Sequence, residues 1–182
     1  MSKPSDKVIR FIESLTLSGD YAGKKFILRD WQKEILYKLF DTLNEDGTRQ
    51  YREAGIWLPR KNAKTQLASG IACFFLYCDP KQLEVYSAGS DREQAGIVFQ
   101  KIQGMVEANP HLMKLSKIIA HQKRIINKKT GSIFASQPRA PSHCLSASRR
   151  RVSTSRSHWS GSFTTTLAKF VTGSLKTRLT CR

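Results

Sequence analysis

One basic run, Arg60-Lys61-Asn62-Ala63-Lys64-Thr65, contains the residue types that bind the phosphates of a nucleotide. A triphosphate site needs backbone N–H groups at a helix N-terminus, a lysine on the β- and γ-phosphates, and a hydroxyl for Mg²⁺. Lys64 and Thr65 stand where the Walker A pattern has its Lys and Ser/Thr, whereas Leu58 and Ala63 replace its two glycines. The run therefore predicts a divergent P-loop for ATP and Mg²⁺. A basic loop that faces solvent is the alternative, and the local pattern leaves both open.

The flanking segments predict the two elements that a P-loop requires. Residues 54–58 (AGIWL) form a short apolar run, which is typical of a buried strand. Residues 65–77 are apolar nearly all round, which is typical of a helix that is covered on most sides. If this helix starts at Ala63, that residue needs only helical dihedrals, so the chain tolerates the loss of a glycine there.

The remaining elements extend this pattern to an α/β fold. Residues 83–88 predict a second strand, and residues 92–108 predict a second helix with its apolar residues at helical spacing. The order strand, loop, helix, strand, helix is typical of a parallel sheet. Further helices are predicted at 7–15 and 31–43, and short strands at 117–120, 124–126 and 132–134.

Three motifs together resemble the large terminase subunit of tailed bacteriophages. They are Asp30-Trp31-Gln32, the run Trp57-Leu58-Pro59-Arg60-Lys61-Asn62-Ala63-Lys64-Thr65, and Tyr86-Ser87-Ala88-Gly89-Ser90 followed by Asp91-Arg92-Glu93-Gln94-Ala95. That family has a Walker A of the type P-R-K-N-(G/A)-K-(T/S) behind a helix with a Trp-Gln pair. A strand that ends in small residues and a helix with a Gln-Ala pair follow. The order and spacing agree over residues 5–134.

The resemblance implies part of a RecA-like P-loop NTPase domain, which drives double-stranded DNA into procapsids. By position, Lys64 and Thr65 would hold the phosphates and Mg²⁺, and Asn62 and Ala63 would complete the loop. Arg60 or Lys61 would stabilise charge on the transferring phosphoryl group. The family also implies the small terminase subunit and the portal protein as partners, and an oligomeric assembly.

Four further residues receive roles from the resemblance. Gln32 would read the adenine edge, and the alternative is an exposed helical glutamine beside a core Trp31. Ser87, Ser90 and Gln94 would contact DNA or couple it to the nucleotide. The alternative for them is ordinary capping of a strand-turn-helix unit.

Charge is distributed unevenly along the chain. Residues 1–107 contain all 14 acidic and 16 basic residues, hence 16 − 14 = +2, whereas residues 108–182 contain 15 basic residues and no acid. The family's Asp-Glu pair, which positions Mg²⁺ and the attacking water, and its acidic nuclease triad are therefore absent from this sequence. We expect very poor ATP hydrolysis by this chain.

Composition divides the chain into an ATPase part at 1–134 and a basic tail at 135–182. The tail is rich in Ser, Thr and Arg without a sustained hydrophobic period, which predicts a poorly structured segment. Two origins stay open: an arm that tracks DNA phosphates, with Arg149-Arg150-Arg151 as its densest point, or coding that is disrupted after about residue 134. A helicase-type ATPase fragment and a non-enzymatic basic nucleic-acid-binding protein are the alternative functions.

Several classes are disfavoured by the sequence. The most apolar stretch, residues 67–78, has twelve residues and is too short to span a bilayer, and no secretory signal is visible, so we expect no membrane partner and a cytoplasmic location. Cys73 and Cys78 are predicted to be buried, reduced thiols. With Cys144 and Cys181 they fit no metal-ligand spacing.

Overall fold

The structure is a computed structural model that describes residues 3–51, 54–59, 61–89 and 92–137, and the backbone of residues 168–172 and 177–180. Five α-helices, two 3-10 helices and six strands lie in these ranges. The helices are α1 (Pro4–Ser14), η1 (Gly19–Tyr21), α2 (Asp30–Asp41), α3 (Lys64–Tyr77), α4 (Arg92–Glu107), α5 (Pro110–Leu115) and η2 (Ala120–Gln122). The strands are β1 (Glu84–Ala88), β2 (Ser116–Ile119), β3 (Arg124–Asn127), β4 (Ile133–Gln137), β5 (Ala168–Thr172) and β6 (Thr177–Thr180).

The described strands form one sheet in the order β2-β3-β4-β1-β5-β6. Strands β1 and β4 are parallel, with Glu84 opposite Ile133, and every other neighbouring pair is antiparallel. The α/β class is confirmed, but the predicted parallel sheet is mixed. Short turns join β2 to β3 and β3 to β4, and strands that follow one another through such turns must run antiparallel.

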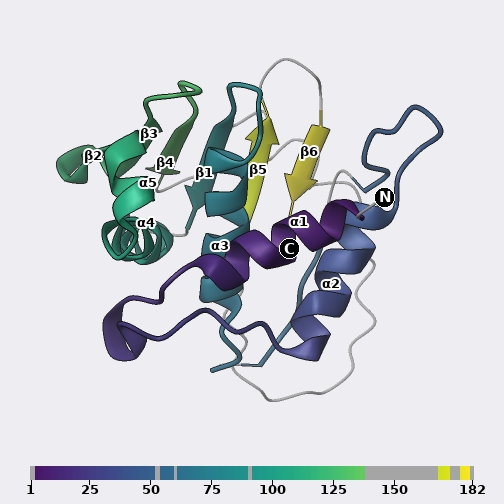
Figure 1. The fold of residues 1–182 in the computed structure, drawn as a ribbon, viewed down its shortest axis with the longest axis horizontal. Coiled ribbons are helices and arrows are strands. Elements are labelled where there is room, and N and C mark those ends of the chain that lie inside the picture. Colours follow the sequence, from purple (N-terminus) through teal and green to yellow (C-terminus); the bar gives the residue numbers. More distant parts are fainter. Residues whose placement is uncertain are drawn as a thin grey trace.

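Helices cover one face of this sheet (Figure 1). Helices α3 and α4 pack against each other and against β1 and β4, and α1 packs on α3 and α2. The buried strand residues Val85, Ile125 and Phe134 join the same apolar core as the inward side of α4. The predicted inward residues of that helix are all buried: Ala95, Val98, Phe99, Ile102 and Val106.

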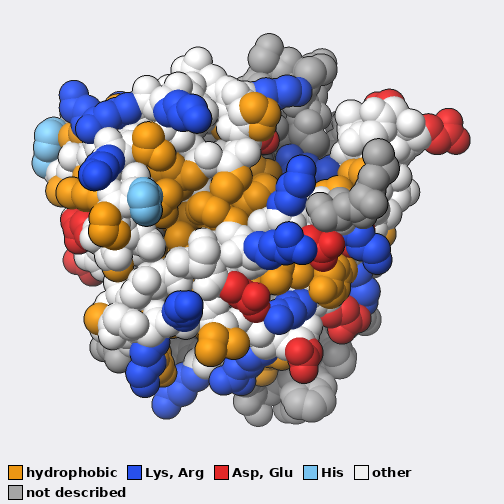
Figure 2. Space-filling view, viewed as in Figure 1, with side chains coloured by type: hydrophobic (Ala, Val, Ile, Leu, Met, Phe, Trp, Pro, Cys, Tyr) orange, Lys and Arg blue, Asp and Glu red, His pale blue; other side chains and the backbone are white. Residues whose placement is uncertain are grey.

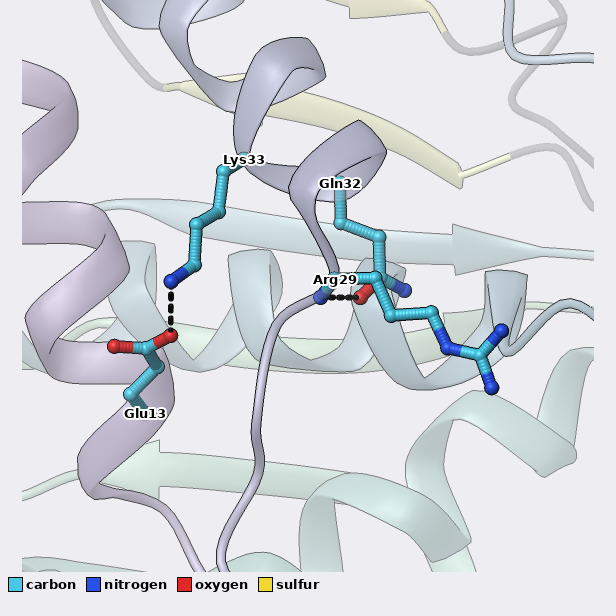
Figure 3. A network of polar contacts seen from close by, with 4 residues as sticks. All are labelled: Glu13, Arg29, Gln32 and Lys33. Atoms are coloured by element: carbon cyan, nitrogen blue, oxygen red, sulfur yellow. Dashed lines mark hydrogen bonds and ion pairs between the residues drawn. The ribbon is translucent and has the colours of Figure 1, made fainter.

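Helices α1 and α2 are joined by polar contacts near both ends of α2. The N–H and Oγ of Ser5 donate to the two carboxylate oxygens of Asp41, at 3.0 and 2.7 Å. Lys33 of α2 pairs with Glu13 of α1 at 2.9 Å (Figure 3). These contacts hold α2, the helix that carries Gln32, against α1.

The strand predicted at residues 54–58 is wrong. No ladder pairing involves residues 54–59, and the side chain of Trp57 is 65% exposed. Strand β1 has β4 on one edge and β5 on the other, so it offers no free edge to this segment.

Two described segments of the predicted basic tail are paired strands, namely β5 and β6. Strand β4 also continues to Gln137, past the predicted boundary at residue 134. The rest of the tail, including Arg149-Arg150-Arg151, lies outside the described residues. The division of the chain at residue 134 therefore stays a prediction.

The described cysteines differ from each other in exposure. Cys73 is fully buried in α3, as predicted, but Cys78 is exposed at the end of that helix, so its predicted burial is wrong. Burial raises the pKa of Cys73 to about 12. Within the described ranges, no cluster of His, Cys, Asp and Glu suits a metal ion, and no helix is long and apolar enough to cross a membrane.

Candidate nucleotide-binding site

A pocket of about 900 Å³ lies between the start of α3 and the segment that leads into α2. Its described lining includes residues 61–66 of the predicted P-loop and Gln32 of α2. The structure thus brings together the two motifs that the sequence assigns to phosphate and adenine, although about thirty residues separate them in the chain.

The start of α3 faces this pocket with backbone N–H groups. The first helical hydrogen bond runs from the N–H of Leu67 to the carbonyl of Ala63, so the N–H groups of residues 64–66 precede the helical ladder. The N-cap residue, Ala63, makes no side-chain capping hydrogen bond. The N–H groups of this first turn and the positive end of the helix dipole favour an anion here.

The turn into α3 uses left-handed backbone conformations. Ala63, the N-cap, has φ 50° and ψ 26°, and Lys61 has φ 68°. The expectation of ordinary helical dihedrals at Ala63 is therefore wrong. A Cβ in this region costs about 1–2 kcal/mol, which is the physical reason that a glycine suits the position in the P-loop pattern.

Lys64 is held at the pocket by a backbone contact. Its ammonium group donates a hydrogen bond to the carbonyl oxygen of Leu58 at 2.7 Å. Nearby, the amide of Asn62 contacts the carbonyl of Pro59 at 3.5 Å, and the carbonyl of Thr65 accepts from Ser69 Oγ at 2.7 Å. Arg60 lies outside the described residues, so its predicted role stays a prediction.

Gln32 is buried rather than exposed. Its side chain is only 2% exposed, and its Oε1 accepts a hydrogen bond from the backbone N–H of Arg29 at 3.0 Å (Figure 3). Trp31 is only partly buried, which reverses the burial that the alternative interpretation assumed. The predicted contact of Gln32 with adenine stays a prediction.

Further lining residues were missed by the sequence analysis. The segment before α2 contributes Tyr21 and Ile27, whose side chains are 52% and 79% exposed, and several cations. Phe26 and Leu28 are buried and Ile27 between them is exposed, but all three residues are apolar, so no alternation in the sequence marked Ile27 as the outward one. No sequence signal pointed to Lys101, which reaches the pocket from α4. Figure 2 shows blue Lys and Arg side chains along the lower part of the molecule, where this segment lies.

The residues at the end of β1 lie outside the described lining of this pocket. Ser87 is 2% exposed, and its Oγ donates to the carbonyl of Ala95 at 3.2 Å, which ties β1 to α4. A Cβ on Gly89 would lie 2.6 Å from the backbone nitrogen of Ala95, so the close start of α4 requires glycine there. Gln94 is exposed on α4, and Ser90 lies outside the described residues. The DNA and coupling roles of Ser87, Ser90 and Gln94 stay predictions.

Comparisons with known proteins identify the family of this chain. Residues 30–144, more than half of the chain, match the family described as "Terminase large subunit, ATPase domain". The terminase large subunit of Enterobacteria phage HK97 is 32% identical over 125 residues, which cover 66% of this chain and 24% of that protein. The crystal structure of the HK97 bacteriophage large terminase has a TM-score of 0.67 and 27% identity, over 77% of this chain and 28% of that one.

The chain therefore spans about a quarter of the length of the relatives that it matches. The matched segment includes Gln32, the loop at residues 61–66 and the whole of α4. These matches favour a terminase over the helicase-type alternative. By the motifs around the pocket, the mixed α/β fold and these similarities, the chain belongs to the family of terminase large subunits, within their ATPase domain.

Proposed function

We propose that this chain is the ATP-binding part of a phage or prophage terminase large subunit, a motor that packages double-stranded DNA into procapsids in the host cytoplasm. One observation carries the proposal: a single pocket unites Gln32 with the first turn of α3 and with Lys64. By the same family relation, we propose that the assembled motor is oligomeric and contacts the small terminase subunit and the portal protein.

In this proposal the triphosphate lies across the start of α3. The N–H groups of residues 64–66 and the ammonium group of Lys64 would bind the phosphates, and a phosphate oxygen would replace the carbonyl of Leu58 as the acceptor for Lys64. Lys61, and Arg60 by position, would lie beside the phosphates. Gln32 would hold the base from the other end of the pocket.

Hydrolysis by this chain should be very slow. No carboxylate follows Glu107 in the sequence, so residues 108–182 do not supply the acidic pair that orients Mg²⁺ and water. For the Mg²⁺ that the family implies, the assigned loop residues offer the hydroxyl of Thr65 and the amide oxygen of Asn62 but no carboxylate. Mg²⁺ sites on proteins normally use one or two carboxylates in addition to phosphate oxygens, so the described lining does not fit a magnesium ion held by the protein.

Isothermal titration calorimetry with ATP tests the binding proposal. Lys64→Ala should weaken ATP binding at least tenfold, since a hydrogen bond to a charged group contributes about 1.5–3 kcal/mol. Lys117→Ala is the matched control, because Lys117 is an exposed lysine of β2 outside the pocket lining. Equal affinity in wild type and Lys64→Ala would overturn the P-loop assignment.

A second candidate, a basic nucleic-acid-binding protein, is favoured by one surface. Lys and Arg side chains gather over β2, β3 and α5, where the sequence contains no acid (Figure 2). This function predicts duplex DNA affinity that falls steeply with salt and survives Lys64→Ala. Fluorescence anisotropy with a labelled duplex at two salt concentrations measures both properties.

A further inference from the structure

The nucleotide pocket carries far more positive charge than its P-loop alone supplies. Its described lining holds six cationic side chains and no carboxylate. The cations come from three separate parts of the chain: the segment before α2, the loop before α3, and α4. They are Lys24, Lys25, Arg29, Lys61, Lys64 and Lys101.

These cations are arranged around the pocket rather than along one loop. The Lys24 ammonium group lies 6.0 Å from the centre of the Tyr21 ring. The Lys101 ammonium group lies over Gly19, at 3.4 Å from the position that a Cβ there would occupy. The Lys64 ammonium group, at the start of α3, donates to the carbonyl of Leu58 at 2.7 Å. An anion in this pocket would therefore meet positive charge on several sides.

The charge of the ligand depends on magnesium. ATP carries about four negative charges when free of metal and about two when it binds Mg²⁺, because the ion contributes two positive charges. A site with carboxylates gains from the ion, because the carboxylates bind it. A site that offers six cations loses attraction when the ion neutralises half of the ligand charge.

We propose that this pocket binds its nucleoside triphosphate as the metal-free tetraanion, in preference to the magnesium complex. The inference rests on the proposed function, because it takes the ligand to be ATP. The binding energy then comes from the six cationic side chains of the lining and the N-terminus of α3. The described lining does not select for a divalent ion. Because the cations act through water and salt at a partly open site, the preference should be about tenfold at low ionic strength.

Calorimetry with ATP in two buffers tests the proposal on the full chain. One buffer is stripped of divalent ions with a chelating resin, so that no chelator anion competes for the pocket. The other contains excess MgCl₂ at matched ionic strength. We expect about tenfold tighter binding in the metal-free buffer, and a steeper loss of affinity with added NaCl there.

Single-charge variants identify the source of the preference. Lys101→Met and Lys24→Met each keep the aliphatic stem but remove one cation, so each should bring the two affinities closer together. Lys117→Met removes an exposed lysine outside the pocket lining and should leave their ratio unchanged. Circular dichroism verifies that each variant is folded. If one of the two pocket variants does not fold, the other carries the test.

The outcomes separate this inference from the proposed function. Tighter binding with Mg²⁺ than without it would overturn the inference and leave ATP binding in place. An unchanged affinity ratio in both pocket variants would also overturn it, since the cations would not be the cause. Loss of ATP binding in both buffers would overturn the proposed function together with the inference.

Discussion

The side-chain oxygen of Gln32 accepts a hydrogen bond from the backbone N–H of Arg29 at 3.0 Å, at the point where α2 begins beside the pocket. A glutamine at this position of the first turn stabilises a helix by satisfying an N–H that lacks a partner in the helical ladder. The amide NH₂ of the same side chain is the part that a base can contact. Gln32 can therefore serve the helix with its oxygen and the ligand with its nitrogen.

Two substitutions separate these roles of Gln32. Gln32→Ala should lower the free energy of unfolding by about 1 kcal/mol, as loss of a capping group does. Gln32→Glu should lose less, because glutamate at the same position can accept the same hydrogen bond. Both variants should lose the amide donor to the base. The ratio of ATP affinity to tripolyphosphate affinity, measured by calorimetry, should therefore fall in both.

The ratio of ATP affinity to tripolyphosphate affinity removes the effect of the added charge in Gln32→Glu, because that charge repels both polyphosphates alike. Urea denaturation supplies the stability comparison. An affinity ratio equal to that of the wild type in both variants would limit Gln32 to its capping contact with Arg29.

The left-handed conformation of Ala63 gives a prediction about the P-loop itself. Ala63→Gly should stabilise the chain by about 1 kcal/mol, because relief of the strained φ of 50° outweighs the greater freedom of glycine in the unfolded chain. Ala72→Gly is the matched control: it is the same substitution at a buried position inside α3 and should destabilise by about 1 kcal/mol or more. Urea denaturation of both variants measures the difference. Destabilisation by Ala63→Gly would contradict the assigned strain.

The helices could be predicted from the sequence, because most of their apolar residues recur at helical spacing. Val98, Phe99 and Ile102 of α4 are all less than 5% exposed, as the pattern required. Gln32 and the loop at residues 61–65 came from motifs and share one pocket in the structure. Local residue order was sufficient for these two motifs, because each lies at the start of a helix that its own apolar residues predict.

The remaining features depend on contacts that local patterns do not contain. Residues 54–58 are apolar enough for a strand, but strand formation needs a free sheet edge, which β1 does not offer. Lys101 lies on a helix whose pattern shows only that its position is not in the core. Its place in the pocket follows from how α4 packs beside α3. The dihedrals of Ala63 depend on the angle at which the chain enters α3.

The buried thiol of Cys73 predicts a loss of stability at high pH. Its pKa is 9.0 when unperturbed, and burial raises it to about 12. Below pH 9 the thiol is protonated in both states, so the contribution is fully present there. Above pH 9 the unfolded chain loses the proton first, and the free energy of unfolding falls by up to about 1.4 kcal/mol per pH unit for this group until the pH passes about 12.

Urea denaturation between pH 8 and pH 10.5 measures this dependence in wild type and Cys73→Ala. The variant should show a shallower decline, although not a flat one, because burial also raises the pKa of Tyr77 and acts in the same direction. Equal slopes in the two proteins would show that Cys73 ionises as easily in the folded chain as in the unfolded one.

The hydrogen bonds between Ser5 and Asp41 predict that the Asp41 carboxylate stabilises the packing of α1 on α2. Ser5 is fully buried, and both its N–H and its hydroxyl depend on the carboxylate of Asp41. Asp41→Ala leaves both donors without that acceptor and should lower the free energy of unfolding by about 1–3 kcal/mol. Asp41→Asn keeps one oxygen and should lose less, and Glu45→Ala, at an exposed carboxylate just beyond α2, should change little. Because α2 carries Gln32, Asp41→Ala should also weaken ATP binding under conditions where it remains folded. Equal stability of Asp41→Ala and Glu45→Ala would contradict the stabilising role of the Ser5–Asp41 pair.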